Sequence, residues 1–317
     1  MGAYASQGAS SSSTTTTVKI GSLSGVAGST VSSGVWQIGS DNRDAVFSGI
    51  FNSGATVTKL GTGNWTLTAA NLMTAAFTIN SGKLTVTNTS GSATGTGIVY
   101  VNNSSTLAGT GIISGGVVVN SGGVLAPGNN NIGTLTLGNN VVLQPDSKTN
   151  IEVSGNLNDK LIVSGTIVLK GTLEMINRGA AYQAGNSYTI FTAGSATGNF
   201  DAILPEKPAE GMKWNLSRIS EGIITVDVAD GIEDIYGASV RAWPVPVKDY
   251  CFISISSLPG EVKIELINQL GVIISAETTN STVENHIINM SKLQSGFYFV
   301  KVADSNNKSF LRKIIKQ

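Results

Sequence analysis

The chain has 317 residues, which is enough for one large domain or two ordinary ones and for a sizeable buried core. Its 20 lysine and arginine residues balance its 20 aspartate and glutamate residues, so no net charge draws it toward nucleic acid or an anionic membrane. Cys251 is the single cysteine, which excludes an intrachain disulfide. Glycine contributes 38 residues, and valine, isoleucine and leucine are spread evenly among the small residues. Such a mixture is typical of short strands joined by tight turns.

Residues 1–17 form a tract of serine, threonine and glycine, MGAYASQGASSSSTTTT. This tract has too little apolar surface to offset the entropy of ordering it, so we expect it to be disordered. It also lacks the basic start and apolar core of a signal peptide, and we expect any export signal to have been removed or to lie outside this chain. No run reaches the roughly 20 apolar residues that span a bilayer, so no transmembrane segment is expected.

Residues 18–228 repeat a short phrase at intervals near 20 residues. VYVN at residue 99 returns as VVVN at residue 117, and LAG at residue 107 returns as LAP at residue 125. A fixed period of this length predicts a solenoid, here a parallel β-helix in which alternate aliphatic side chains point inward. Asn80, Asn102 and Asn120 each follow a strand at an equivalent place, where stacked amides can hydrogen-bond from one turn to the next.

The end of the repetitive region is rich in aromatic residues. Tyr182, Tyr188, Phe191, Phe200 and Trp214 follow a long stretch without any, so residues 182–228 are interpreted as a cap that covers the open end of the stack. Residues 229–239, ADGIEDIYGAS, are a short polar linker.

Residues 240–317 have a different pattern. EVKIELIN at residue 261 alternates apolar and charged positions, and similar runs follow between glycine, asparagine and serine turns. Six or seven such strands in a short segment indicate a small Ig-like antiparallel β-sandwich. The predicted fold is therefore all-β, with a solenoid followed by this sandwich.

Residues 57–86 resemble a known repeat. The text VTKLGTGNWTLTAANLMTAAFTINSGKLTV is similar to the passenger-associated, autotransporter-type β-strand repeat. The similarity is carried by Lys59, Gly61, Gly63, Leu67, Ile79, Gly82 and Leu84. The resemblance implies a right-handed β-helix exposed on a bacterial surface, and it implies no particular activity.

The C-terminal segment resembles the type A C-terminal sorting domain of the type IX secretion system. The similarity is carried by Pro244, Pro246, Gly271, Leu293, Gly296, Tyr298, Val300, Lys313 and the basic C-terminus. Val245 stands where the family usually has asparagine. The resemblance implies that an outer-membrane translocon shuttle reads this domain. A sortase would then cut in the linker and join the protein to an anionic lipopolysaccharide at the cell surface.

Right-handed β-helices also host polysaccharide lyases and glycosidases, whose chemistry needs paired carboxylates, or a carboxylate-bound cation with a basic residue, in one groove. Between residues 45 and 145 the only charges are Lys59 and Lys83. Charged residues elsewhere in the repetitive region look scattered and are interpreted as solvated turn residues: Asp41, Arg43 and Asp44 near the start, and Asp146, Lys148, Glu152, Asp159 and Lys160 later. We therefore expect no catalytic residues and no enzyme activity.

Other chemistries find few residues to support them. His286 is the only histidine, and it lies with Cys251 in the sorting segment, so triads and histidine-based zinc sites are not expected. GTGIISGG at residue 109 opens into strand rather than helix, which argues against a dinucleotide site. Trp36 and Trp65 could stack on sugars, but Trp65 belongs to the repeat and is expected to pack inside. No cofactor or metal is expected.

The sequence thus favours a non-catalytic, adhesin-like or stalk-like surface protein with a cleavable export domain and a glycan or host ligand that cannot be named. Two alternatives stay open. One is a carbohydrate-binding or polysaccharide-degrading β-helix. The other is a fragment of a longer passenger whose active region lies upstream.

Overall fold

The computed structural model describes residues 16–229, 239–256, 260–280, 286–305 and 309–317. The chain divides into two compact units, residues 1–227 and 228–317. Almost all of the predicted disordered segment and of the predicted linker lie outside the described residues. Within the described residues the chain is nearly all β, and its one helical element is a single 3-10 turn, Ile219–Glu221.

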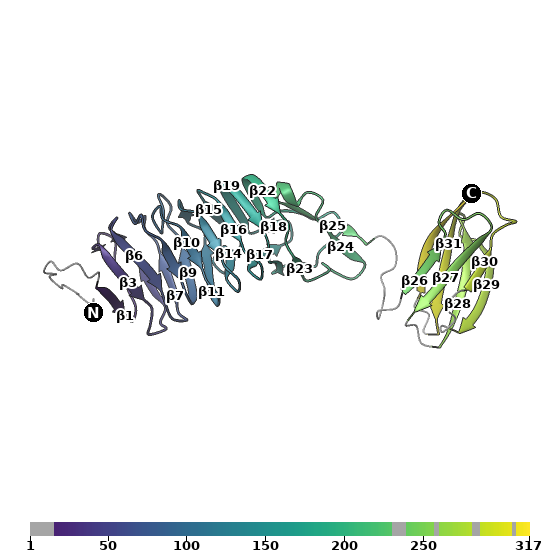
Figure 1. Cartoon of the computed structure of the whole chain (residues 1–317), viewed down its shortest axis with the longest axis horizontal. Helices are drawn as coiled ribbons and strands as arrows, with labels where there is room; N and C mark the ends of the chain where they lie inside the picture. The colour runs from purple at the N-terminus through teal and green to yellow at the C-terminus, as the bar shows by residue number, and fades with distance from the viewer. Residues whose placement is uncertain (1–15, 230–238, 257–259, 281–285, 306–308) are drawn as a thin grey trace. The chain divides into compact units, whose positions relative to one another are not determined.

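The first unit contains two large sheets with parallel neighbours (Figure 1). Sheet A runs in the order β1 (Thr17–Ile20), β3 (Gly34–Ile38), β6 (Ala55–Lys59), β8 (Phe77–Ile79), β10 (Val99–Val101), β13 (Val117–Val119), β16 (Val141–Leu143), β19 (Lys160–Leu169), β15 (Thr134–Leu137) and β12 (Ile112–Ile113), with β22 (Phe191–Gly198) beside β19. Sheet B runs in the order β4 (Ala45–Phe47), β7 (Asn64–Leu67), β9 (Gly82–Val86), β11 (Ser105–Gly109), β14 (Val124–Pro127), β17 (Lys148–Ser154), β20 (Thr172–Asn177) and β23 (Ala202–Leu204).

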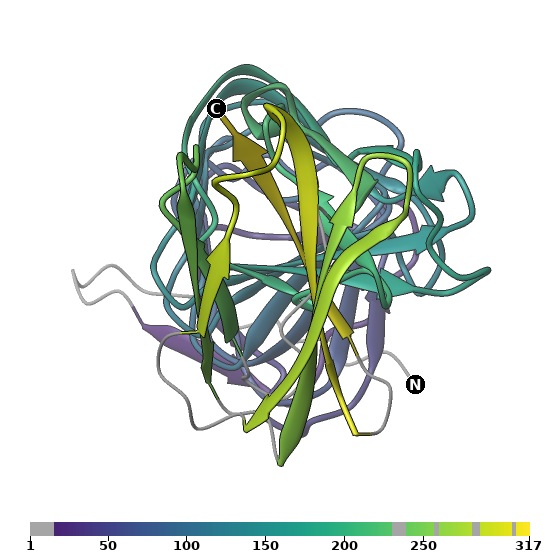
Figure 2. The ribbon, with the colours of Figure 1, turned by 90° about the vertical axis from the view of Figure 1, so that its right-hand side faces the viewer.

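Two smaller pairings complete the stack. β2 (Thr30–Val31) pairs with β5 (Ile50–Phe51), and β18 (Leu157–Asn158) turns back antiparallel onto β17. The long strand β19 pairs through its first residues with β15 and through its last with β16, so it belongs to two faces of the unit. Viewed from the end, successive turns of ribbon lie one behind another (Figure 2).

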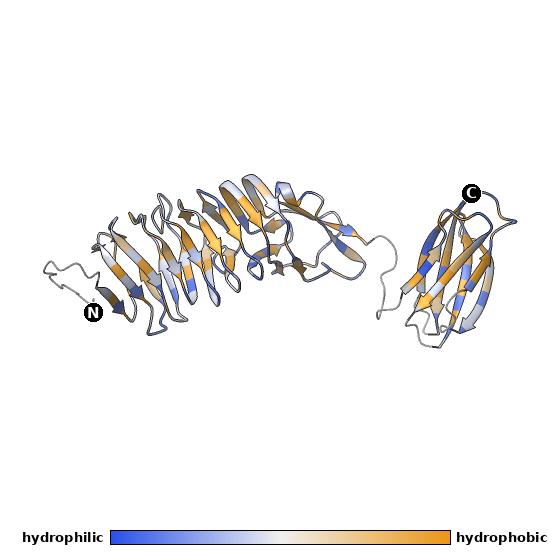
Figure 3. Ribbon diagram, in the orientation of Figure 1, coloured by the Kyte–Doolittle hydropathy of each residue, from blue (hydrophilic) through white to orange (hydrophobic). Residues whose placement is uncertain are grey.

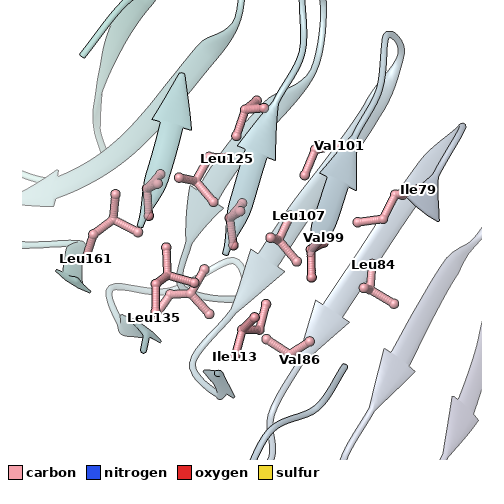
Figure 4. Packing of buried hydrophobic residues seen from close by; sticks show 14 of the residues in the cluster. Ile79, Leu84, Val86, Val99, Val101, Leu107, Ile113, Leu125, Leu135 and Leu161 are labelled. Carbon is pink, nitrogen blue, oxygen red and sulfur yellow. The ribbon is translucent and has the colours of Figure 1, made fainter. Parts of the chain in front are cut away.

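The repeated phrases are strands that pair with one another. Val99 pairs with Val117, and Leu107 pairs with Leu125, so an offset of 18 residues brings the chain one strand further along each sheet. Aliphatic residues at alternate positions point into a shared interior (Figure 4). Along the strands, hydrophobic segments of the ribbon stand among hydrophilic ones (Figure 3). Full burial of each aliphatic side chain contributes about 1.5–3 kcal/mol, and a continuous row of them holds the stack together.

One interior row can be followed through six strands. Its members occupy equivalent positions in sheet A and each is at most 1% exposed: Val57, Phe77, Val99, Val117, Val141 and Ile167. The pairings extend along open sheets, and no sheet closes on itself. Parallel sheets in a nearly all-β chain are thus confirmed, whereas the handed β-helix stays an interpretation.

The aromatic-rich region after residue 182 forms a small antiparallel sheet of β21 (Ser187–Thr189), β25 (Ile223–Val228) and β24 (Met212–Asn215). Tyr182 contacts Tyr188 and Trp214 edge to face, with ring centroids 6.2 and 5.0 Å apart. Tyr188 and Phe191 are buried in the same cluster as the aliphatic rows.

The second unit consists of two antiparallel sheets. One contains β26 (Ser239–Trp243), β27 (Tyr250–Ser256) and β30 (His286–Asn289), and the other contains β29 (Ile273–Asn280), β28 (Glu261–Asn268), β31 (Gly296–Asp304) and β32 (Ser309–Lys316). A separate hydrophobic core joins them, with Cys251, Ile253, Val300 and Ile314 fully buried. Among the described residues, β26 and β32 are end strands of their sheets, and the C-terminal end of β32 also bonds to Val247, whose backbone N–H donates to the Ile315 carbonyl oxygen at 2.7 Å.

Candidate functional site

The predicted repeat residues surround a buried lysine. Lys59 is 1% exposed, and its Nζ donates to the carbonyl oxygens of Leu60, Gly61 and Ser81 at 2.8, 2.9 and 3.1 Å. Burial lowers the pKa of this amine to about 8, although Asp44 opposes the shift. Lys59 therefore ties one turn of chain to the next.

The glycines of the same motif sit where backbones approach closely. Gly61 has a φ of +67°, and a Cβ there would lie 1.9 Å from the Gly39 carbonyl oxygen. Gly82 has a φ of +68° and faces the Gly61 carbonyl in the same way. Leu67 and Leu84 are fully buried.

The three predicted asparagines are joined by side-chain hydrogen bonds. Asn102 Nδ2 donates to Asn80 Oδ1 at 2.7 Å, and Asn120 Nδ2 donates to Asn102 Oδ1 at 2.7 Å. Asparagine suits this place because its amide is both donor and acceptor.

The sorting-segment residues are spread over the second unit. Gly271 lies in the turn between β28 and β29 with a φ of +79°, and Gly296 begins β31. The Tyr298 hydroxyl donates to the Gln294 carbonyl oxygen at 3.0 Å. Lys313 Nζ lies 3.9 Å from the ring centroid of Phe297. Further members are Pro244, Pro246 and the half-buried Leu293.

A polar hollow lies on the outer face of sheet B. It encloses about 130 Å³ and extends from β9 to the residues after β20. Its lining, called the sheet B hollow below, consists of Lys83, Ala108, Ala126, Pro127, Gly128, Asn130, Asn150, Glu152, Asp159, Ile176 and Arg178. The strands position these side chains because outward positions on successive strands fall in line, as Glu152 does beside Ile176.

Asp159 holds one wall of the sheet B hollow. It is fully buried, and its Oδ1 accepts from the Gly133 backbone N–H at 2.8 Å while its Oδ2 accepts from the Glu152 N–H at 2.9 Å. Burial raises the pKa of this carboxyl group to about 6, and the two backbone hydrogen bonds oppose the shift. Asp159 therefore fixes β17 to the loop that contains Gly128.

Glu152 and Arg178 form an ion pair at the rim of the same hollow. Arg178 donates from its second terminal guanidinium nitrogen to Glu152 Oε1 at 2.7 Å and from Nε at 3.2 Å. The Arg178 side chain is 58% exposed and the Glu152 side chain 13%. The adjacent Asn150 has a buried Oδ1 with no hydrogen-bond partner. The hollow thus brings together two carboxylates, a guanidinium group and an amide.

The prediction that Glu152 and Asp159 are scattered, solvated turn residues is wrong. The structure places both in the lining of the sheet B hollow, because Asp159 follows the short return strand β18. Arg178 is not among the candidate residues predicted from the sequence. Its place in the hollow follows from the strand register, since it lies two residues beyond Ile176, the strand partner of Glu152. Lys83 lies at the far end, four strands away in the sheet order.

The remaining charged candidates lie elsewhere. Arg43 Nε is 3.9 Å from Asp41 Oδ2, and Asp44 accepts from the Asn64 backbone N–H at 2.7 Å. Asp146, Lys148 and Lys160 are not part of the sheet B hollow. Among the residues that the structure describes, no group of three or more histidine, cysteine, aspartate or glutamate side chains is arranged to hold a metal.

Aromatic and nucleophilic candidates are mainly in packed positions. Trp65 is 2% exposed and packs with Phe47, Phe51 and Phe77. Trp36 is half-buried, and its Nε1 donates to the Ser32 carbonyl oxygen. Burial raises the pKa of the Cys251 thiol to about 11, so this thiol is a poor nucleophile.

His286 is paired with an acid of the second unit. Its Nε2 lies 3.2 Å from Glu277 Oε2.

In the described part of the chain, no helix is long and apolar enough to cross a membrane.

Comparison with known proteins gives one family match, in the second unit. Residues 241–317 match a family model described as the secretion system C-terminal sorting domain. The autotransporter-type resemblance of residues 57–86 receives no support from these comparisons and stays a prediction.

Two proteins share further similarity. "Ulvan lyase NLR42" from Nonlabens ulvanivorans is 30% identical over 103 residues, which are 32% of this chain and 17% of that protein. Chitinase ChiW from Paenibacillus sp. str. FPU-7 aligns in structure with a TM-score of 0.25 and 14% identity, covering 94% of this chain and 24% of that one. A score this low carries no argument about fold or function. This chain spans less than a fifth of the lyase and about a quarter of the chitinase.

The expectation of no enzyme activity is wrong on this evidence. The curated relative is named for the cleavage of a polysaccharide, and its identity with this chain reaches 30% over 103 residues. The lack of acids between residues 45 and 145 does not extend to the whole unit, because acidic and basic side chains lie together further along the stack.

The sorting prediction is confirmed. A sorting domain of this kind implies interaction with the type IX secretion machinery, which exports proteins through the outer membrane. Residues 241–317 therefore form a type IX C-terminal sorting domain, and the protein is secreted to the cell surface or the extracellular space.

Proposed function

We propose that the first unit is a right-handed parallel β-helix that takes part in polysaccharide processing, with the sugar chain held in the sheet B hollow. The single observation that carries the proposal is the convergence of Glu152, Asp159, Arg178 and Asn150 around one hollow on the outer face of sheet B. The partial identity with an ulvan lyase supports a polysaccharide as the ligand class.

The β-helix interpretation is supported by the strand pairings. Sheets A and B both advance by one strand for each turn of chain, and β19 contributes to a third face through β15 and β12. The offset between paired parallel strands of sheets A and B ranges from 18 residues, as for Val99 and Val117, to 30 residues, as for Leu161 and Phe191. Such coils place parallel strands about 4.8 Å apart on each outer face, which gives an extended surface suited to a linear polymer.

The chemistry of the hollow suits a sugar chain. Carboxylate oxygens and the Asn150 amide can form hydrogen bonds with sugar hydroxyl groups. The Arg178 guanidinium group can form a bidentate pair with an acidic group of the sugar. The unpartnered Asn150 Oδ1 is a ready acceptor for a hydroxyl donor. Glu152 is the side chain placed to exchange a proton with the ligand, because its carboxylate reaches the rim while Asp159 is fully buried.

The export route follows the sorting domain. An outer-membrane shuttle would deliver the folded chain, and a sortase would cut between the units and attach the protein to an anionic lipopolysaccharide. The polysaccharide-processing unit would then face the surroundings of the cell.

Purified full-length chain should be retained in affinity electrophoresis through ulvan, and turnover should appear as unsaturated chain ends in the ultraviolet. We expect Glu152→Gln and Arg178→Met each to weaken retention by roughly tenfold or more, the usual effect of removing a charged hydrogen-bond partner. Arg43→Ala, which removes an exposed charge far from the hollow along sheet B, is the control. Melting curves are recorded for every variant to separate loss of binding from loss of stability, because the Arg178 side chain is 58% exposed whereas the Glu152 side chain is only 13% exposed.

If both hollow variants retain and turn over the polysaccharide as the parent does, the ligand binds to another surface. A parent chain that neither binds nor cleaves ulvan or other anionic polysaccharides would overturn the proposal as a whole.

A further inference from the structure

A second hollow, of about 640 Å³, lies in the sorting domain beside two end strands. Its lining comes from β26, its neighbours and β32: Val240, Arg241, Ala242, Trp243, Val245, Ser254, Arg312 and Lys313. Among the described residues, β26 pairs with β27 alone, whereas β32 pairs with β31 and, at its C-terminal end, also with Val247. The hollow lies along the side of the sandwich formed by β26 and the Arg312–Lys313 part of β32. We refer to it as the sorting-domain hollow.

The charge of this hollow has one sign. Three of its lining residues are cationic, Arg241, Arg312 and Lys313, and none of the described residues that line it is an aspartate or a glutamate. The chain as a whole is neutral, so this local excess is a property of the site. A concave surface with charges of one sign concentrates ligands of the other sign.

Two of the cations are held in place by the domain itself. Arg312 Nε donates to the Val240 carbonyl oxygen at 2.8 Å, which anchors the guanidinium group between β32 and β26. Lys313 Nζ lies 3.9 Å from the centroid of the Phe297 ring, which limits the freedom of its stem. Arg241 is exposed and lies on β26, opposite Ser254 of β27. Positioned cations lose less entropy when a ligand binds.

An apolar wall accompanies the charges. Trp243 is 40% exposed and Val245 is 44% exposed, although both are large apolar side chains. Trp243 is supported from behind by Phe252, with ring centroids 6.0 Å apart and planes 26° apart. A rigid aromatic surface next to arginine is the composition found at the centre of protein–protein contacts.

We propose that the sorting-domain hollow binds an extended acidic segment, carrying apolar side chains, of the secretion-machinery protein that reads this domain. The occupant is a protein because the domain is a secretion signal, and it is acidic because three of the eight described residues that line the hollow are cationic. The mixture of cations with an aromatic wall fits a peptide of alternating acidic and apolar residues. This inference rests on the family match and is independent of the polysaccharide proposal.

The test uses the full-length chain and a short fluorescent peptide that alternates glutamate with leucine. A double variant, Arg241→Ala with Lys313→Ala, removes two exposed cations and leaves Arg312 to hold β26. The control, Lys248→Ala with Lys292→Ala, removes the same charge from exposed positions outside the lining. By fluorescence anisotropy we expect the double variant to bind roughly five- to tenfold more weakly, and the control to bind as the parent does.

Three results would overturn the inference: equal binding by the double variant, equal binding of a peptide with glutamine in place of glutamate, or the absence of any peptide binding. Tighter binding to phosphatidylglycerol vesicles, lost in the same double variant, would assign the hollow to lipid and also contradict it. In a bacterium with this secretion system, we expect the double variant to accumulate in the periplasm while it keeps the melting temperature of the parent. Normal export of a double variant that has lost peptide binding would show that the hollow does not serve secretion.

Discussion

Two parts of the first unit share one interior but differ in their surfaces. Between residues 45 and 145 the stack carries only Lys59 and Lys83 as charges, and the turns that follow bring Glu152, Asp159 and Arg178 together. Aliphatic rows continue through both parts, from Val99 in one to Ile167 in the other. The interior is therefore sufficient to hold the stack, and the outer face can carry chemistry without altering it.

Each part nevertheless contains one buried charge, and the two charges respond to burial in opposite directions. Burial lowers the pKa of Lys59 to about 8 and raises that of Asp159 to about 6. Both groups bind backbone of a neighbouring turn, Lys59 through carbonyl oxygens and Asp159 through N–H groups. A buried charge in this unit thus supplies hydrogen bonds that the backbone of a tight turn cannot supply itself.

The largest effect is expected when a charge enters the aliphatic interior without a partner. Leu125 is fully buried and pairs with Leu107, so Leu125→Asp should lower the free energy of unfolding by more than about 4 kcal/mol and melt several turns. Circular dichroism during heating is the measurement.

Val118 provides the matched control for that substitution. It lies on the outer face of sheet A and is half-buried, between Tyr100 and Val142. Val118→Asp should therefore leave the melting temperature nearly unchanged. Equal losses for Val118 and Leu125 would contradict the assignment of inner and outer faces.

Much of this fold could be predicted from the sequence, because the interior repeats. The spacing that links Val99 to Val117 is visible as text, and it is also the pairing distance of β10 and β13. Alternation along each run identified the inward residues, and the glycine and lysine of the repeat motif mark its turns. A periodic interior can be predicted from the sequence because each turn needs buried aliphatic residues at equivalent positions.

The second-largest effect is expected at the buried cation. Lys59→Met keeps the length of the side chain but leaves the carbonyl oxygens of Leu60, Gly61 and Ser81 without their donor. We expect a loss of about 2–4 kcal/mol in the free energy of unfolding, measured by denaturant titration. Lys83→Met is the control, since the Lys83 side chain lies on the outer face at the rim of the hollow. A Lys59→Met chain as stable as the parent would show that these bonds contribute little.

The candidate site could not be predicted in the same way. Glu152, Asp159 and Arg178 do not belong to a repeated phrase of the sequence, so no repeat pattern marks them. Their meeting depends on β18, which turns back onto β17 and sends Asp159 beneath the Glu152 backbone. A local reversal of this kind has no repeating signal, so the residues looked scattered until the register of β17 and β20 was known.

The smallest effect is a dependence of stability on pH that arises from the buried anion. The pKa of Asp159 in the folded chain is about 6, above the ordinary value of 3.8, so the folded state binds a proton more tightly than the unfolded state does. Stability from this group is therefore greatest below pH 4 and is lost as pH rises through 6. Between pH 5 and pH 7 the parent chain should lose about 1 kcal/mol through Asp159 alone.

Asp159→Asn isolates this contribution, because the amide has nearly the same shape and no charge in this range. The measurement is the difference in unfolding free energy between pH 5 and pH 7, taken for the parent and for the variant, so that contributions from all other groups cancel. A smaller difference in the variant would assign the slope to Asp159. Identical differences would mean that Asp159 titrates as it does in the unfolded chain, and that its two backbone hydrogen bonds fully offset the cost of its burial.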